Sequence, residues 1–320
     1  PRLNIETTRL SGSISLLGGR IDDLKLNDYR QTLDAGADTV TLLSPVGNAG
    51  AYYALYGWAP GSGLSATDVP GADTEWQVAS GTSLSETTPV TLQWDNGAGL
   101  TFRRQISVDE NYMFSVQQTV ENSGDTPVSL APYGLLARHG EPEDLKNFFI
   151  LHEGVVGMAD GELTETDYSD MPDFAIDPQW GGPTEITEVE ESGWIGFTDH
   201  YWMATLIPQA GAFKSVAKYN PNSDIYQTTA FLPTQTVAPG QSATVSTRLF
   251  AGAKEWETIR NYQNDNNVQG FLDSIDWGWF FFLTKPIFAV LHWLNSVIGN
   301  MGWSIIGLTL LIKAILFPFL

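Results

Sequence analysis

The sequence predicts a mainly β protein: a large antiparallel β-sandwich, followed by an amphipathic helix at a membrane surface and by a transmembrane α-helix. Two observations lead to this prediction. From residue 1 to about residue 250, apolar and polar residues alternate, and clusters of Gly, Pro, Asn and Asp recur about every ten residues, which is typical of antiparallel strands. Residues 277–320 contain no acidic side chain and end in an apolar run, which is typical of a membrane segment.

Several segments carry clear strand signals. In residues 10–24, apolar and polar side chains alternate on either side of a Gly-Gly turn. The clearest hairpin joins residues 90–94 to residues 100–106 across the Gly-containing loop 95–99. The last strand is expected at 243–250. So many strands in one run predict two large packed sheets.

The remaining segments of the body have less regular patterns. Residues 158–192 are rich in Asp, Glu and Pro, which predicts a solvated surface loop, because their spacing does not match a calcium-binding loop. Residues 254–260 predict a short helix, and the polar residues 264–267 predict a connector.

Charge separates the body from the tail. The formal net charge is -21, and residues 277–320 contribute only two lysines, so residues 1–276 carry -23 (-21 less +2). Binding to nucleic acid requires clustered Lys and Arg, so we expect no nucleic-acid partner. The chain has no cysteine, which excludes disulfides, thiolate metal sites and cysteine nucleophiles.

The tail begins with residues typical of a membrane surface. Trp277, Trp279 and Phe280–Phe282 form an aromatic belt of the kind found at headgroup level. Between Lys285 and Ile298, polar residues fall on one helical side and apolar residues on the other, which predicts an interfacial amphipathic helix. The polar residues are Lys285, His292, Asn295 and Ser296. Pro286 is acceptable there if it lies in the first helical turn.

A single lysine interrupts the final apolar run. Residues 299–302 break the amphipathic helix, and the run from Trp303 to Leu320 contains Lys313, about 15 Å along a helix from Trp303. That is near the middle of a hydrocarbon core of about 30 Å. A charge there costs about 2.5–3.5 kcal/mol on insertion scales and normally faces a protein interior or a water-filled cavity. The alternative is a lysine near a helix end that snorkels to water.

These signals divide the chain into four parts. We expect a β domain at 1–252, a short helix and linker at 253–276, an interfacial helix at 277–299 and a membrane helix at 302–320. Both ends of the chain look cut from something longer.

No catalytic centre, metal site or cofactor is predicted. The four histidines have no carboxylate placed beside them by the sequence, and we expect them to be satisfied or solvent-facing: His139, His152, His200 and His292. Residues 265–276 imitate part of a calcium loop, but its terminal Glu is replaced by Asp276, so chance similarity is the better explanation.

Three runs of the tail carry a family resemblance. They are Asp276–Phe280, then Lys285–Phe288 with His292-Trp293-Leu294, and then Val297–Ile306. Together they resemble the start of the membrane core of the YidC/Oxa/Alb insertase family in its Gram-negative YidC form. The preceding acidic domain is similar to that form's periplasmic β-supersandwich, a mutarotase-like fold.

The resemblance implies a bacterial inner-membrane insertase and chaperone, multi-pass when complete, with residues 1–276 in the periplasm. Its partners would be nascent inner-membrane proteins, Sec translocon components and the lipid bilayer. Lys313 occupies the position at which the family usually has an Arg that faces a hydrophilic groove. Lysine keeps the positive charge but lacks the planar guanidinium, which can bind a carboxylate through two hydrogen bonds. Trp277, Trp279 and Trp303 would mark the membrane interface. The alternative is a membrane-anchored periplasmic carbohydrate-binding or mutarotase-like module.

Overall fold

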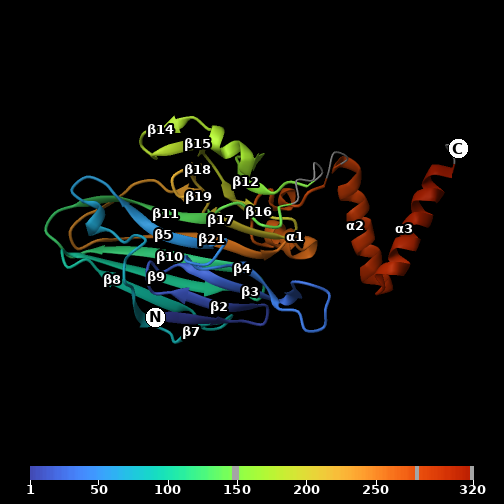
Figure 1. Cartoon of the computed structure of the whole chain (residues 1–320), viewed down its shortest axis with the longest axis horizontal. Helices are drawn as coiled ribbons and strands as arrows, with labels where there is room; N and C mark the ends of the chain where they lie inside the picture. The colour runs from blue at the N-terminus through green and yellow to red at the C-terminus, as the bar shows by residue number, and fades with distance from the viewer. Residues whose placement is uncertain (146–150, 278–280, 318–320) are drawn as a thin grey trace. The chain divides into compact units, whose positions relative to one another are not determined.

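The computed structural model describes residues 1–145, 151–277 and 281–317. Their strands form two β-sheets that pack face to face (Figure 1). Residues 1–145 and 152–274 form one compact unit, and the two helices that follow belong to a second.

In the described residues the larger sheet has 12 strands, all but one pair of them antiparallel. Its order is β14 (Ile176–Asp177), β15 (Gly182–Val189), β18 (Phe213–Asn220), β19 (Ile225–Phe231), β11 (Val128–His139), β5 (Tyr52–Pro60), β3 (Ile21–Arg30), β2 (Leu10–Ser15), β1 (Arg2–Glu6) and β7 (Ser83–Leu84). Two further strands pair with β11 and β3 respectively: β20 (Gln235–Val237) and β4 (Thr39–Leu43).

The smaller sheet has nine strands within the described ranges. Its order is β13 (Glu162–Asp167), β12 (Gly154–Ala159), β16 (Gly193–Thr198), β17 (Trp202–Pro208), β21 (Ser242–Ala253), β10 (Met113–Asn122), β9 (Leu100–Val108), β8 (Val90–Asp95) and β6 (Gln77–Ser80). The predicted hairpin is confirmed as β8 and β9, with Trp94 opposite Phe102 and Val90 opposite Ile106.

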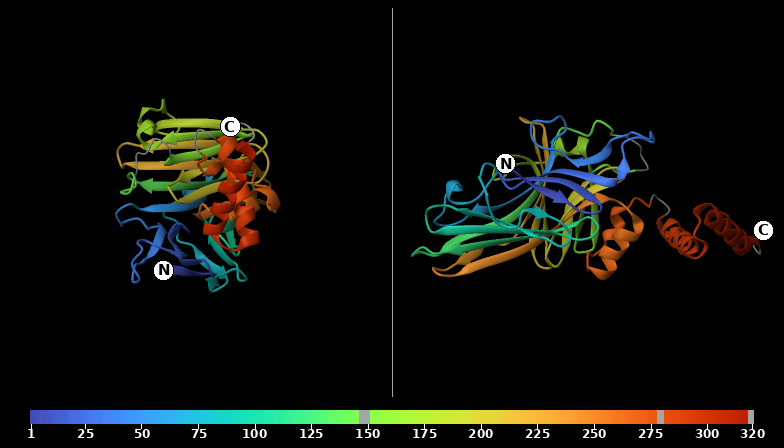
Figure 2. Two further views of the ribbon diagram at one scale, coloured as in Figure 1. Left: turned by 90° about the vertical axis from the view of Figure 1, so that its right-hand side faces the viewer. Right: turned by 90° about the horizontal axis from the view of Figure 1, so that it is seen from below.

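The core lies between the two sheets. Along β9, Leu100, Phe102 and Ile106 are buried and alternate with more exposed residues, as the period of two predicts. Each such side chain contributes about 1.5–3 kcal/mol when fully buried. Most of β10 keeps this alternation, whereas β11 has consecutive buried residues at 130–132 and 136–137. Figure 2 shows the strands gathered in two layers.

The predicted surface loop at 158–192 is wrong. This segment contains β13, β14, β15 and a 3-10 helix, η2 (Tyr168–Asp173). Tyr168 is buried, receives a hydrogen bond from Arg138 at 3.1 Å and stacks on Phe197. Acidic side chains suggested a loop because β13 is exposed, and an exposed strand tolerates charges that a central strand does not.

A short helical segment covers the outer face of the nine-stranded sheet. It consists of α1 (Trp256–Asp265) and the 3-10 helix η3 (Phe271–Ser274). Phe271 is fully buried and meets Trp194 and Phe250 edge to face, with ring centroids 5.5 and 5.3 Å away. The helix predicted at 254–260 therefore exists, but it begins at Trp256 and runs further.

Two more helices end the described chain: α2 (Phe281–Ile298) and α3 (Met301–Leu316). The sequence placed Pro286 in the first turn of its helix, and this is wrong, because α2 begins five residues earlier and Pro286 lies inside it. A proline there cannot donate to the carbonyl four residues before it, although such sites are tolerated in membrane helices.

Candidate functional site: the helical pair at residues 281–317

A two-residue corner separates α2 from α3. Gly299 has φ +74, a left-handed value that favours glycine, and its N–H donates to the carbonyl of Asn295 at 2.8 Å. The side chain of Asn300 accepts from the N–H of Trp303 at 3.2 Å and so caps α3. Ser304, fully buried, donates to the carbonyl of Asn300 at 2.8 Å. The break expected at 299–302 is therefore a helix corner with a fixed geometry.

One aromatic ring at the start of the tail lies close to a cation. Lys285 Nζ lies 5.9 Å from the ring centroid of Trp277, within range of a cation–π contact. Phe288 meets the same ring edge to face at 5.7 Å, and the hydroxyl of Thr284 donates to the Trp277 carbonyl at 2.8 Å. Trp279, also predicted at the interface, lies outside the described residues.

Both helices expose large apolar side chains. Trp293 is 60% and Trp303 is 64% exposed, and many neighbours are similar. These neighbours are Phe282, Leu283, Phe288, Val297, Ile298, Met301, Ile305, Ile306, Leu310, Leu311, Ile315, Leu316 and Phe317. Lys285 and His292 on α2 are only half exposed, so the predicted division into a polar and an apolar side is less clean than the sequence suggested. Contiguous exposed apolar surface of this extent marks a surface that contacts a membrane or another protein.

In the parts of the chain that the structure describes, no helix combines the length and the apolar character needed to cross a membrane.

Lys313 is exposed and lies in the last turn of α3. The N–H of Phe317 donates to its carbonyl. Leu310, three residues before it, is 64% exposed, and Phe317, four residues after it, is 79% exposed. The lysine is the only charged residue in α3; on its own helix face Leu310 and Phe317 are apolar, and Thr309, four residues before it, is polar and exposed.

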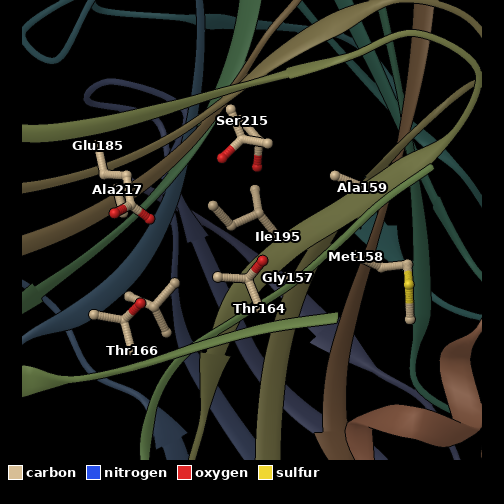
Figure 3. A pocket seen from close by; sticks show the side chains of 11 residues that line it. Gly157, Met158, Ala159, Thr164, Thr166, Glu185, Ile195, Ser215 and Ala217 are labelled. Carbon is tan, nitrogen blue, oxygen red and sulfur yellow. The ribbon is translucent and has the colours of Figure 1, made fainter. Parts of the chain in front are cut away.

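The β unit contains a small pocket between the sheets (Figure 3). Thr164 and Thr166 of β13 lie on one side, and Glu185 of β15 with Ser215 of β18 on the other, around Ile195. Its volume is about 20 Å³, enough for one water molecule but far below the 300–1,000 Å³ typical of ligand pockets. As it stands, this pocket cannot hold a sugar ring.

Three histidines lie in the β unit. His139 is the last residue of β11, and its Nε2 lies 3.1 Å from the Tyr53 hydroxyl. Burial, and then the Arg20 charge, lower the pKa of His139. His152 Nδ1 lies 3.0 Å from Asp167, a carboxylate that the sequence did not place there. His200 stacks on Tyr201 at 3.9 Å.

Among the described residues, no group of three or more His, Asp or Glu side chains is arranged to hold a metal ion. In the segment that imitates a calcium loop, Asp265 ends α1 and Gly270 has φ +69 ahead of η3.

One polar network was not predicted. The Glu255 carboxylate receives two hydrogen bonds from Arg9, at 2.9 and 2.5 Å, and others from the hydroxyls of Tyr29 at 2.5 Å, Thr258 at 2.8 Å and Tyr112 at 3.3 Å. Glu255 immediately precedes α1, so the network fastens the start of that helix to both sheets. No local pattern signals it, because Arg9 and Glu255 are 246 residues apart.

A buried arginine was also missed. Arg104 of β9 is 1% exposed and donates to the carbonyls of Tyr56, Gly19 and Gly18 at 2.7, 3.2 and 3.3 Å. Its guanidinium lies over the Trp76 ring at 4.5 Å. Burial lowers its pKa to about 10, so it is still charged at neutral pH. In the described residues it forms no ion pair with a carboxylate, and three carbonyls solvate it instead.

The comparisons decide the family. A family model described as the YidC periplasmic domain matches residues 2–290. The chain belongs to this family. Among its curated relatives, the "Membrane protein insertase YidC" of Roseobacter denitrificans is 66% identical over 99% of the chain, and that of Ruegeria pomeroyi is 65% identical over 99%. The chain spans 52% and 53% of the length of these relatives. Membership of the YidC family indicates an inner-membrane protein with a periplasmic segment.

A solved structure defines the fold of the YidC periplasmic domain more closely. A galactose mutarotase related enzyme from Lactobacillus acidophilus superposes with a TM-score of 0.52 at 10% identity, covering 78% of this chain and 97% of that chain. This likeness confirms the predicted mutarotase-like β architecture. At such low identity it concerns the fold alone and carries no activity over.

Proposed function

We propose that the chain is the periplasmic domain and the start of the membrane core of a membrane protein insertase and chaperone. The observation that carries the proposal is the family match over residues 2–290 together with relatives named insertase at 66% and 65% identity. The complete protein assists insertion and folding of inner-membrane proteins, alone or with the Sec translocon. Its substrates are nascent membrane proteins.

The helical pair supports a place in the membrane. Its exposed apolar side chains would be costly in water and are favoured in lipid. We assign α2 to the periplasmic interface, where Trp293, with its apolar body and polar N–H, is stable. We assign α3 to the bilayer as the first core helix, although its 16 described residues cover only about 24 Å of the roughly 30 Å core.

Lys313 is the residue that we expect to act on substrates. A cation among apolar side chains attracts a carboxylate or a polar segment of an entering chain and lowers the cost of moving it into the bilayer. This role needs a positive charge and not the fork geometry of arginine. It also needs a hydrated hollow that further helices of the complete protein would enclose.

The test uses the full-length parent reconstituted in vesicles, with insertion of a single-span substrate that carries an acidic external tail measured by protease protection. Lys313→Arg should insert at the normal rate and Lys313→Glu at least tenfold more slowly. Lys25→Glu makes the same charge change on an exposed position of β3 and should have no effect. Equal rates for Lys313→Arg and Lys313→Glu would refute the charge mechanism. A photo-cross-linker at position 313 should capture the substrate.

A mutarotase-like activity has only the fold in its favour. The pocket of about 20 Å³ cannot hold a sugar as it stands. Anomer interconversion by the purified chain would revive that alternative, and its absence leaves the insertase proposal in place.

A further inference from the structure

The strands at the edges of the two sheets differ in how they are protected. An exposed edge strand offers unpaired N–H and C=O groups to other chains. Proteins usually prevent such pairing by keeping the edge strand short or by placing a bulge, a proline or a lysine in it. Within the described residues, β7, β14 and β20 are only two or three residues long. The pairings of β4 and β6 contain register shifts. These five edges are therefore poor templates for another strand.

The edge strand β13 lacks these protections. It runs for six residues, Glu162–Asp167, without proline, glycine or lysine. Its pairing with β12 is continuous, and among the described strands β12 is its only partner. At about 3.3 Å per residue it presents an edge of about 20 Å. Five of its six residues are exposed and the sixth is half-buried.

Both ends of β13 are fixed, so the edge is already ordered. At its start, the carboxylate of Asp160 in the β12–β13 turn accepts hydrogen bonds from the N–H groups of Glu190, Glu191 and Ser192, at 2.8, 2.7 and 3.2 Å. At its end, Asp167 pairs with His152 at 3.0 Å. A partner strand would therefore bind without first ordering the edge, which lowers the entropic cost of association.

The acidic side chains near β13 favour a cationic partner. Glu162, Glu165 and Asp167 all project from β13, and Glu185 lines the pocket on its inner side. A second copy of this acidic chain would be repelled, whereas lysine or arginine on an added strand would meet opposite charge. Thr164 and Thr166 face the pocket (Figure 3), so the side chains that an added strand points inward would lie next to small hydroxyl groups.

We propose that β13 is a docking edge for an extended, cationic polypeptide segment, which adds to the nine-stranded sheet as a tenth strand. Main-chain hydrogen bonds would supply most of the affinity, and alternating basic side chains the specificity. This site is separate from the helical pair and does not depend on the insertase proposal.

The first experiment uses the 320-residue chain in detergent and a fluorescein-labelled hexapeptide of alternating lysine and threonine. Fluorescence anisotropy should show binding, and the glutamate–threonine peptide should not bind. The variant Glu165→Lys, on the side of β13 away from Thr164 and Thr166, should weaken binding at least fivefold. The matched control, Asp38→Lys, makes the same charge change in the exposed β3–β4 connection and should bind normally. Circular dichroism checks that both variants are folded.

A second experiment separates strand pairing from charge attraction. Two further peptides carry N-methyl groups on one or the other set of alternate backbone nitrogens, so that each can pair along only one edge. Antiparallel strand addition predicts that one of them binds and the other does not, because at a fixed strand direction pairing by the opposite edge turns the lysines to the side of Thr164 and Thr166. A photo-cross-linker replacing Leu163 should capture the peptide, whereas one replacing Val78 on β6 should not; both side chains are 41% exposed.

Three results would overturn the proposal. One is no binding of the lysine peptide to the chain. Another is equal binding of the two methylated peptides, which would show charge attraction alone. The third is equal capture at positions 163 and 78.

Discussion

Removal of the Phe271 side chain should loosen the segment that follows the last strand. Phe271 is fully buried and packs edge to face on Trp194 and Phe250, and its ring centroid lies 6.4 Å from that of Tyr262. Truncation of a buried Phe to Ala costs about 3–5 kcal/mol, because transfer free energy is lost and a cavity remains. The free energy of unfolding of a domain is typically about 5–15 kcal/mol, so Phe271→Ala should remove a large part of it.

Urea unfolding followed by tryptophan fluorescence measures the loss of unfolding free energy. Hydrogen exchange identifies the segment of the chain that is destabilised. Amides of residues 256–274 should lose protection first, because Phe271 joins this segment to the nine-stranded sheet. Leu33→Ala is the control, since Leu33 is fully exposed, and it should change stability by less than about 0.5 kcal/mol. A loss below about 1 kcal/mol for Phe271→Ala, with unchanged exchange, would show that the aromatic contacts do not hold the segment.

Two further substitutions test the polar contacts of the β unit. Glu255→Gln should cost about 1–2 kcal/mol, a figure reduced for partial exposure. Burial raises the pKa of Glu255, but hydrogen bonds from Arg9, Tyr29 and Thr258 outweigh it and leave the pKa below the ordinary 4.5. Its contribution is therefore complete above pH 4.5 and is lost as the pH falls through the folded-state value, so the difference from wild type should shrink in acid unfolding curves; a constant difference would contradict this. Gly19→Ala should cost at least about 2 kcal/mol in thermal unfolding, because the added Cβ would lie 2.4 Å from Arg104 Nη1 at φ +62. Gly63→Ala, at φ +84 with nothing within 4 Å, is its control and should cost only about half as much.

Local patterns predicted the fold where strands adjacent in the sequence pair with each other. The hairpin of β8 and β9 was predictable because alternation and a Gly-containing turn lie within 20 residues. Pairings between distant segments, such as β10 with β21 or the parallel pair of β1 with β7, leave no local signal. The acidic stretch was misjudged for a related reason: charge indicates exposure, and an edge strand is exposed.

The candidate site could be predicted only in part. The corner at Gly299 and the aromatic residues near Lys285 followed from composition and helix-breaking residues. The role of Lys313 stays a prediction, because it depends on surroundings that the rest of a longer protein would supply. The network around Glu255 and the carbonyl-solvated Arg104 arise from tertiary packing, which brings together residues far apart in the chain.

The corner at Gly299-Asn300 has a consequence for the direction in which Lys313 points. Only two residues separate the helices, and both are hydrogen-bonded into the adjoining turns, which restricts rotation of α3 about its own axis relative to α2. A residue added to α3 between this corner and Lys313 would rotate the ammonium by about 100° around the helix. Under the proposed placement of α2 at the periplasmic interface, the azimuth of the cation follows from the orientation of that helix.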